Sequence, residues 1–203
     1  MSRQNIATWL GSQFARLRLC GSWLWRLEAR LKGVEMPGRV QFLGRPIISV
    51  APGSRLVLGD GVVLASARRA NPLGLAHPTV LRAMTRGAEL VLGPRVGVSG
   101  ASLCAGVSIQ VGEGTIFGAG ALVLDNDFHH ASGDWGWETD CGRNARPIRI
   151  GRGVFVGARA IILKGATIGD RAVIGAGAVV VTDVPPGAVA VGNPATIRMR
   201  VEG

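Results

Sequence analysis

The sequence contains no tyrosine, and lysine occurs only at Lys32 and Lys164. The 23 basic residues are therefore almost all arginine, and with 13 acidic residues they give a formal net charge of +10. A charge of this size is typical of proteins that meet nucleic acid, an anionic membrane or a phosphorylated ligand. Because the arginines are spread along the chain without a recognition motif, we expect no nucleic-acid binding.

Cysteine is also scarce. Cys20, Cys104 and Cys141 are odd in number and widely spaced, which argues against a disulfide framework or a zinc knuckle and favours a reducing cytoplasm. The chain has no apolar run of about 18 residues, so we expect no membrane-spanning helix. Its first residues lack the uninterrupted apolar core and the cleavage site of a signal peptide.

Glycine, by contrast, is abundant. The 31 glycines and 10 prolines make up about a fifth of the 203 residues, where about 12% is usual. Collagen is excluded because glycine does not recur at every third position. Disorder is excluded because 47% of the residues are hydrophobic. The glycines must therefore lie inside a packed structure that requires them.

A six-residue repeat accounts for many of these glycines. Glycine follows four of the six aliphatic residues in the clearest stretch, and small or β-branched residues lie four positions on. The clearest stretch contains Ile150, Val156, Ile162, Ile168, Ile174 and Val180. The same frame contains Leu92, Val98 and Cys104, then, after one extra residue, Val111, Phe117 and Val123. This period predicts a triangular coil of short parallel strands, in which each face sends one aliphatic side chain into a narrow core.

Three segments do not follow the repeat. Residues 1–36 form a predicted N-terminal helical segment, because apolar residues recur at every third or fourth position among arginines. Through residues 1–32, this basic amphipathic helix would lie on an anionic membrane, or it would cap the coil or a neighbouring subunit. Residues 37–203 form the predicted coil, with inserted loops near residues 66–86 and 129–147. Loops on a rigid scaffold commonly carry function.

The stretch IGRGVFVGARAIILKGATIGDRAVIGAGAVVVTDVPPGAVAVGNPA, residues 150–195, resembles the hexapeptide-repeat acyltransferases. The likeness covers residues from about 40 to about 200. It implies an all-β fold, a left-handed parallel β-helix; the hand comes from the resemblance, because left-handed crossovers are otherwise rare. It also implies a homotrimer in which two subunits build each active site.

The run Asp125-Asn126-Asp127-Phe128-His129 is similar to the D-x-D-F-H motif of the sugar and xenobiotic acetyltransferase branch of this family. The similarity implies that His129 is a general base, which takes the proton of an acceptor hydroxyl as that hydroxyl attacks acetyl-CoA. Imidazole suits this role because its ordinary pKa of about 6.5 leaves it largely neutral at pH 7. Asp127 or Asp125 would fix its tautomer. The alternative is a surface histidine without a catalytic role.

The resemblance further implies that acetyl-CoA, the donor, lies in the groove between neighbouring subunits, beside the C-terminal coils. Backbone groups at the corners would hold the pantetheine, and basic side chains would either meet the phosphates or form a solvated edge. The matching corner positions are Gly157, Ala158, Ala176 and Gly177, and the candidate basic side chains are Lys164 and Arg198. No metal is expected.

A sugar or glycan acceptor is expected under the two loops, where tryptophan faces can stack on sugar rings. The candidate residues are Asn71, Ser99, Asp125, His130, Trp135, Trp137, Arg143 and Phe155. These features predict an acetyl-CoA-dependent O-acetyltransferase, acting in surface polysaccharide biosynthesis. We expect it in the cytoplasm, with peripheral contact at the inner face of the cell membrane as a further option.

Three alternatives stay open. An N-acetyltransferase acting on an amino sugar or an antibiotic would use the same histidine. A carbonic anhydrase with the same coil would need three zinc-binding histidines, and the chain has only three, of which His129 and His130 are adjacent. A non-catalytic scaffold would need none of them.

Overall fold

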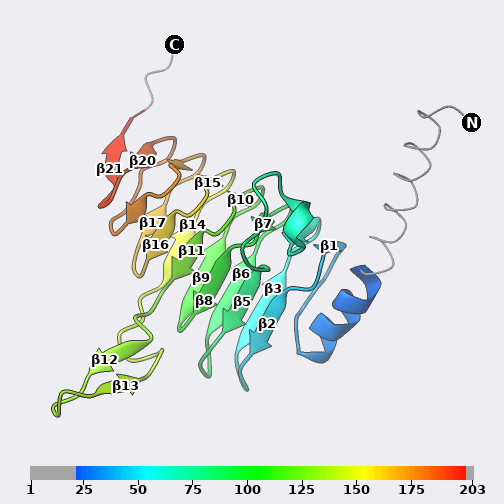
Figure 1. The fold of residues 1–203 in the computed structure, drawn as a ribbon, viewed down its shortest axis with the longest axis horizontal. Coiled ribbons are helices and arrows are strands. Elements are labelled where there is room, and N and C mark those ends of the chain that lie inside the picture. The colour runs from blue at the N-terminus through cyan, green and yellow to red at the C-terminus, as the bar shows by residue number, and fades with distance from the viewer. Residues whose placement is uncertain (1–21, 200–203) are drawn as a thin grey trace, which may run out of the picture.

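The computed structural model describes residues 22–199, and most of them wind into a coil of short parallel strands (Figure 1). The strands form three sheets, which are the three faces of a left-handed parallel β-helix. Face A contains β3 (Arg55–Leu58), β6 (Glu89–Leu92), β9 (Ser108–Val111), β14 (Ile148–Ile150) and β17 (Thr167–Ile168).

Face B contains β1 (Val40–Leu43), β4 (Val62–Ala65), β7 (Gly97–Ser99), β10 (Ile116–Phe117), β15 (Phe155–Val156), β18 (Val173–Ile174), β20 (Val189–Val191) and β21 (Thr196–Arg198). Face C contains β2 (Ile47–Val50), β5 (Val80–Ala83), β8 (Ser102–Ala105), β11 (Leu122–Leu124), β16 (Ile161–Leu163) and β19 (Val179–Val180). The chain visits the faces in the order A, B, C, so three edges join them.

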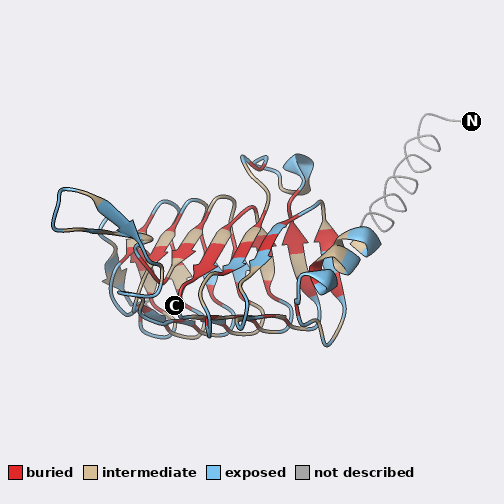
Figure 2. Ribbon diagram, turned by 90° about the horizontal axis from the view of Figure 1, so that it is seen from below, coloured by how far each residue is buried: buried red, intermediate tan, exposed pale blue. Residues whose placement is uncertain are grey.

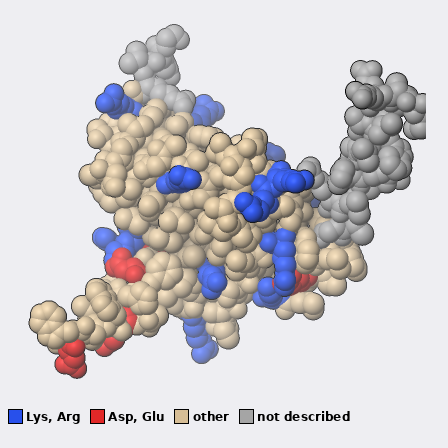
Figure 3. Space-filling model, viewed as in Figure 1, with Lys and Arg blue, Asp and Glu red and all other residues tan. Residues whose placement is uncertain are grey.

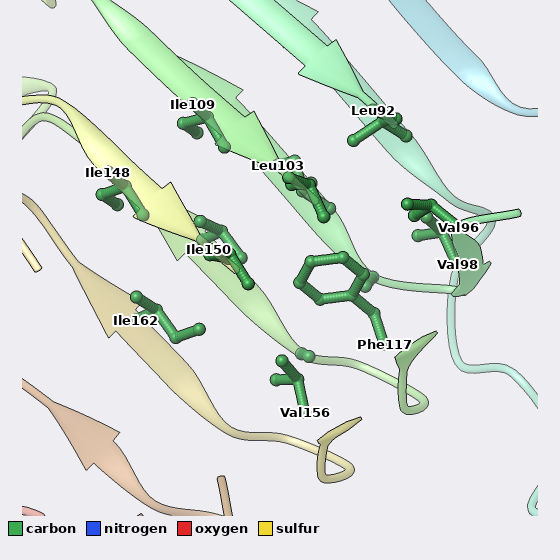
Figure 4. Close-up of a cluster of buried hydrophobic side chains, with 14 of the residues drawn as sticks. Leu92, Val96, Val98, Leu103, Ile109, Phe117, Ile148, Ile150, Val156 and Ile162 are labelled. Carbon is green, nitrogen blue, oxygen red and sulfur yellow. The ribbon is translucent and has the colours of Figure 1, made fainter. Parts of the chain in front are cut away.

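The core is a stack of mainly aliphatic side chains, with Phe42 and Phe117 among them, one layer above another (Figure 4). Ile150 pairs with Ile168, and Val156 pairs with Ile174, so equivalent positions of successive coils lie in register. All six frame residues from Ile150 to Val180 are at most 3% exposed. The six-residue frame predicted from the sequence is therefore confirmed over these coils.

One position of the predicted frame is wrong. Leu103, not Cys104, pairs with the inward-facing Val123 and is fully buried in the core. The corner at Gly100 is one residue shorter than the repeat expects, so the frame slips before it reaches β8. Cys104 faces outward and is almost completely covered; burial raises the pKa of its thiol to about 11.

Glycine is required where one coil approaches the next. A Cβ atom at Gly118 would lie 2.6 Å from the backbone nitrogen of Ala158, which no side chain can tolerate. At Gly177 the requirement is conformational instead, because its φ of 68° lies in the left-handed region. These two positions show why the repeat needs glycine at its corners.

The first end of the coil is closed by a helix at residues 22–31 (Figure 2). Ala29 is buried, and Trp25 packs against the core. Arg26 donates a hydrogen bond to the carbonyl of Val40 at 2.9 Å. The described part of the predicted N-terminal helix thus packs as a cap, while residues 1–21 lie outside the described residues. Within residues 22–199, no helix is long and apolar enough to cross a membrane.

Two insertions interrupt the coil. The first leaves after β4, contains a short 3₁₀ helix (η1, Arg68–Ala70), and ends at β5. It is shorter than the predicted loop near residues 66–86, because residues 80–83 already form β5 (Val80–Ala83), a strand of face C. The second leaves after β11, before the predicted start near residue 129, and returns at β14, directly after the predicted end at residue 147. It contains the hairpin of β12 (His129–Ala131) and β13 (Trp137–Thr139), which projects from the coil (Figure 1).

Candidate active site

The hairpin of β12 and β13 carries both adjacent histidines. Its two strands pair with each other in a separate two-stranded sheet. In the antiparallel register, His129 lies opposite Thr139 and His130 lies opposite Glu138. The three faces of the coil form a triangular prism. The hairpin begins at the edge where face C would otherwise turn into face A, and this C–A edge carries the two histidines.

Thr139 is the side-chain partner of His129. Nδ1 of His129 and Oγ1 of Thr139 lie 3.0 Å apart. In the tautomer that carries its hydrogen on Nδ1, the ring donates to the threonine oxygen, and Nε2 keeps a free lone pair. Because the side chain of His129 is exposed, its Nε2 atom can accept a proton from a bound molecule. Thr139 was not predicted from the sequence. It lies outside the six-residue repeat, and only the register of the hairpin places it opposite His129.

Asp125 has neither of its two predicted roles, which were to orient His129 and to bind the acceptor. Its carboxylate is completely buried and accepts hydrogen bonds from the backbone amides of Gly106, Val107 and Ser108 at 2.6, 2.8 and 2.7 Å. Asn126 donates a further hydrogen bond to it at 2.9 Å. The prediction that Asp125 orients His129 or meets the acceptor is therefore corrected. Its oxygens bind the β8–β9 corner and anchor the start of the second insertion.

Asp127 also does not contact the ring of His129 in this arrangement. Its carboxylate forms an ion pair with Lys164, which follows β16 at the C–A edge. Asp127 was predicted as a catalytic residue and Lys164 as a donor-binding residue, and the structure brings the two together. The ion pair ties the segment that leads to His129 to the next coil.

The remaining hairpin residues form a polar cluster and an exposed tip. Nε2 of His130 lies 3.0 Å from the Glu138 carboxylate, which also accepts a hydrogen bond from Arg143 at 3.1 Å. His130 and Arg143 were both predicted, and Glu138, which joins them, was not. Trp135 and Trp137 are exposed, so their rings are free of the coil.

The other predicted residues gather mainly at a different edge, where face B turns into face C. Asn71 lies in the first insertion, which leaves from this B–C edge, and Ser99 pairs with Ala65 at its start. The corner residues Gly157, Ala158, Ala176 and Gly177 continue the same edge towards the C-terminal coils. Ala176 and Gly177 are exposed there, while Gly157 is buried against Ala176. The width of face C therefore separates these residues from His129 within one chain.

Two predicted residues lie on face B itself. Phe155 is half exposed and pairs with the equally exposed Ile116 of the preceding coil. Arg198 is exposed on β21, the last strand of the sheet. Neither residue is at the edge that carries His129. Among residues 22–199, no group of three or more histidine, cysteine or acidic side chains could hold a metal ion.

The repeat also matches known proteins. Residues 147–182 match the family model described as the hexapeptide repeat of succinyl-transferase. Nodulation protein L of Rhizobium meliloti (strain 1021) is 44% identical over 91 residues, which are 44% of this chain and 48% of that protein. A candidate acetyltransferase of Staphylococcus aureus (strain COL) is 34% identical over 76 residues, 37% of this chain and 35% of its own.

A solved structure shows the same fold. A point mutant of AntD, an N-acyltransferase from Bacillus cereus, in complex with dTDP-4-amino-4,6-dideoxyglucose and coenzyme A, aligns with 88% of this chain and 89% of its own. The TM-score is 0.54 at 14% identity, so the likeness concerns the fold. The chain thus contains a hexapeptide repeat, and its partial sequence matches include a candidate acetyltransferase. The matches span about half or less of the length of these two curated relatives.

Proposed function

We propose that this protein transfers an acetyl group from acetyl-CoA to a sugar hydroxyl, in surface polysaccharide biosynthesis in the cytoplasm. His129 is the general base. The observation that carries the proposal is the pairing of His129 with Thr139 on a hairpin that projects from a hexapeptide coil. This pairing supplies an exposed imidazole with a fixed orientation, which direct acyl transfer requires.

The reaction needs one proton to move twice. The acceptor hydroxyl gives its proton to Nε2 of His129 while its oxygen attacks the thioester carbonyl. The carbon–sulfur bond then breaks, and the imidazolium returns the proton to the leaving thiolate. Throughout, Oγ1 of Thr139 accepts the hydrogen of Nδ1, which keeps the ring from turning and stabilises its charged form.

The two edges of the prism support a homotrimer. His129, Asp127 and Lys164 lie at the C–A edge, while Ala176 and Gly177 lie at the B–C edge. A single site that uses both sets needs the C–A edge of one copy beside the B–C edge of the next. Such a head-to-tail contact forms a ring where the rotation between copies closes, and a three-copy ring would contain three equivalent sites.

The B–C edge is the proposed place of the pantetheine chain of acetyl-CoA. Ala176 and Gly177 are exposed at this corner, and a Cβ at Gly177 would meet no atom within 4 Å. An extended pantetheine chain can approach such a corner closely. AntD structures with TM-scores above 0.5 contain coenzyme A or 3-hydroxybutyryl-CoA, which is consistent with an acyl-CoA donor on this fold.

N-acetylation of an amino sugar is the second candidate. AntD is an N-acyltransferase, and its complex contains a dTDP-4-amino sugar. A neutral amine attacks a thioester as a hydroxyl does, so His129 would serve both reactions. The fold therefore fits the two acceptors about equally. The two reactions differ in whether the acetyl group is attached to an oxygen or to a nitrogen atom of the acceptor.

A thiol-release assay with acetyl-CoA tests the proposal. The full chain is incubated with a panel of methyl glycosides and, separately, with a matched panel of amino sugars. We expect release that depends on a glycoside hydroxyl, with the ester product confirmed by its lability to mild hydroxylamine. Release only with amino sugars would establish the N-acetyl alternative. Failure to bind or turn over acetyl-CoA would favour a non-catalytic scaffold.

A further inference from the structure

The helix at residues 22–31 uses one side to cap the coil. Ala29 and Trp25 pack on the core, Arg26 reaches Val40, and the hydroxyl of Ser22 accepts a hydrogen bond from the amide of Phe42 at 3.2 Å. At about 100° per residue, these helix residues fall on one side. The cap is therefore complete without the opposite side of the helix.

The opposite side is an apolar surface, which we call the outer stripe: Trp23, Leu24, Leu27 and Leu31. Their side chains are 63%, 49%, 44% and 81% exposed. Their spacing places them within about 100° of arc, the width of an apolar face that helices of globular proteins normally bury. An exposed cluster of this kind marks an interaction surface.

Exposed basic side chains lie on the helix and on the coil that adjoins it. Arg30 is exposed on the helix itself, and Arg39 and Arg45 are exposed on the adjoining first coil. Arg45 and Lys32 both pair with Glu28, at 2.9 and 2.7 Å, so this group of one acid and two bases keeps a single net positive charge. Figure 3 shows basic side chains over the end of the coil that adjoins the helix.

We propose that the outer stripe docks on a membrane surface that contains anionic phospholipid. Tryptophan and leucine on one face of a helix enter the headgroup boundary, and flanking arginines meet the lipid phosphates. A second copy of the chain is a poorer occupant. Four side chains fall far short of the roughly 20–30 residues that a stable interface contributes from each side, and two arginine-rimmed stripes would repel one another.

This inference does not depend on the proposed reaction, but the two are compatible. In a homotrimer of coils lying side by side, three outer stripes would face the same way. Simultaneous docking of three stripes raises the overall affinity without any new contact. The hairpin with His129 emerges towards the opposite end of the coil (Figure 1), so the acceptor site would stay accessible.

Flotation of the full chain with lipid vesicles tests the proposal. The vesicles are phosphatidylcholine alone or phosphatidylcholine with phosphatidylglycerol. We expect the protein to float with the anionic vesicles and to be released by salt. The double substitution Leu27→Gln with Leu31→Gln should lower partitioning roughly tenfold or more, since about 1.4 kcal/mol of lost apolar burial is tenfold in affinity.

The matched control is Leu73→Gln, an exposed leucine in the first insertion, which should leave partitioning unchanged. Thermal melting checks that the variants fold, and Trp23→Gln replaces the double variant if its melting changes. Absence of wild-type flotation, or equal flotation of wild type and variant, overturns the proposal. A change in the mass of the assembly by light scattering on substitution would mean that a second copy covers the stripe, which also overturns it. None of these results alters acetyl transfer in solution.

Discussion

Nδ1 of His129 lies 3.0 Å from Oγ1 of Thr139, directly across the antiparallel pair of β12 and β13. The contact joins a residue of the D-x-D-F-H motif to a residue that no motif identifies. It shows that a hydroxyl, rather than either aspartate of the motif, is placed to orient the ring. Each aspartate has another partner: backbone amides for Asp125 and Lys164 for Asp127.

Replacement of Thr139 by valine should lower kcat about 10- to 100-fold with KM for acetyl-CoA little changed. The substitution keeps the shape of the side chain but removes the oxygen that orients the ring, an effect comparable to loss of an outer-shell partner. Thr139→Ser should recover most of the activity. Steady-state kinetics of both variants, with Thr196→Val as a control on β21, check this. Equal losses for serine and valine would show that the hydroxyl is not the cause.

Substitution of Asp127 by asparagine should have a much smaller effect on kcat, about threefold or less, because its carboxylate pairs with Lys164 and not with His129. A double-mutant cycle with Lys164→Met should give a coupling in stability of at most about 1 kcal/mol, since Asp127 is half exposed. A loss of kcat as large as that of Thr139→Val would return Asp127 to a catalytic role.

Asp125→Ala should destabilise the fold by about 2–4 kcal/mol. The substitution leaves the amides of Gly106, Val107 and Ser108 without their acceptor, and each unpaired buried group is costly. Urea unfolding followed by circular dichroism measures the change, with Asp134→Ala at the hairpin tip as the control. If the two variants unfold at the same urea concentration, the buried carboxylate does not hold the corner.

The helix cap should weaken at acid pH. Hydrogen bonds from Arg45, then from Lys32, lower the pKa of Glu28 from 4.5 to about 2. A lowered pKa stabilises the folded state above the ordinary value, and this contribution is lost as the pH falls from 4.5 towards 2. Glu28→Gln should therefore lower Tm at pH 7 by a small amount, because the pair is partly exposed. The difference from wild type should vanish near pH 2; a constant difference from pH 7 to pH 2 would contradict this.

The coil was predictable from the sequence because its core is local and periodic. Each side chain in the frame from Ile150 to Val180 enters the same narrow interior, so sequence spacing alone reports burial. The frame was wrong at Cys104 because the corner at Gly100 is shorter. Between Leu103 and Val111 the chain gains two residues relative to the six-residue repeat, and Asp125 of the following coil binds the amides of that corner. No local pattern reveals such a contact between coils.

The site was predictable only in part for the same reason. His129 was predicted from its motif, and the segment that forms the hairpin was predicted as an interruption of the repeat. Its partner Thr139 depends on the register of that hairpin, and the partner of Asp127 lies on the next coil. The candidate residues lie on two different edges because of the way the chain winds. Motif positions along the sequence do not show which edge each residue occupies.

The most direct test of the proposed acyl transfer is the rate of thiol release from acetyl-CoA by wild type and His129→Ala, with the best acceptor of the glycoside panel. Calorimetry of coenzyme A binding to both proteins accompanies it. We expect the variant to lose about 10²- to 10⁴-fold in kcat, the usual contribution of a general base, while its Kd for coenzyme A stays the same. Unchanged turnover in His129→Ala would contradict the assignment of this residue as the base.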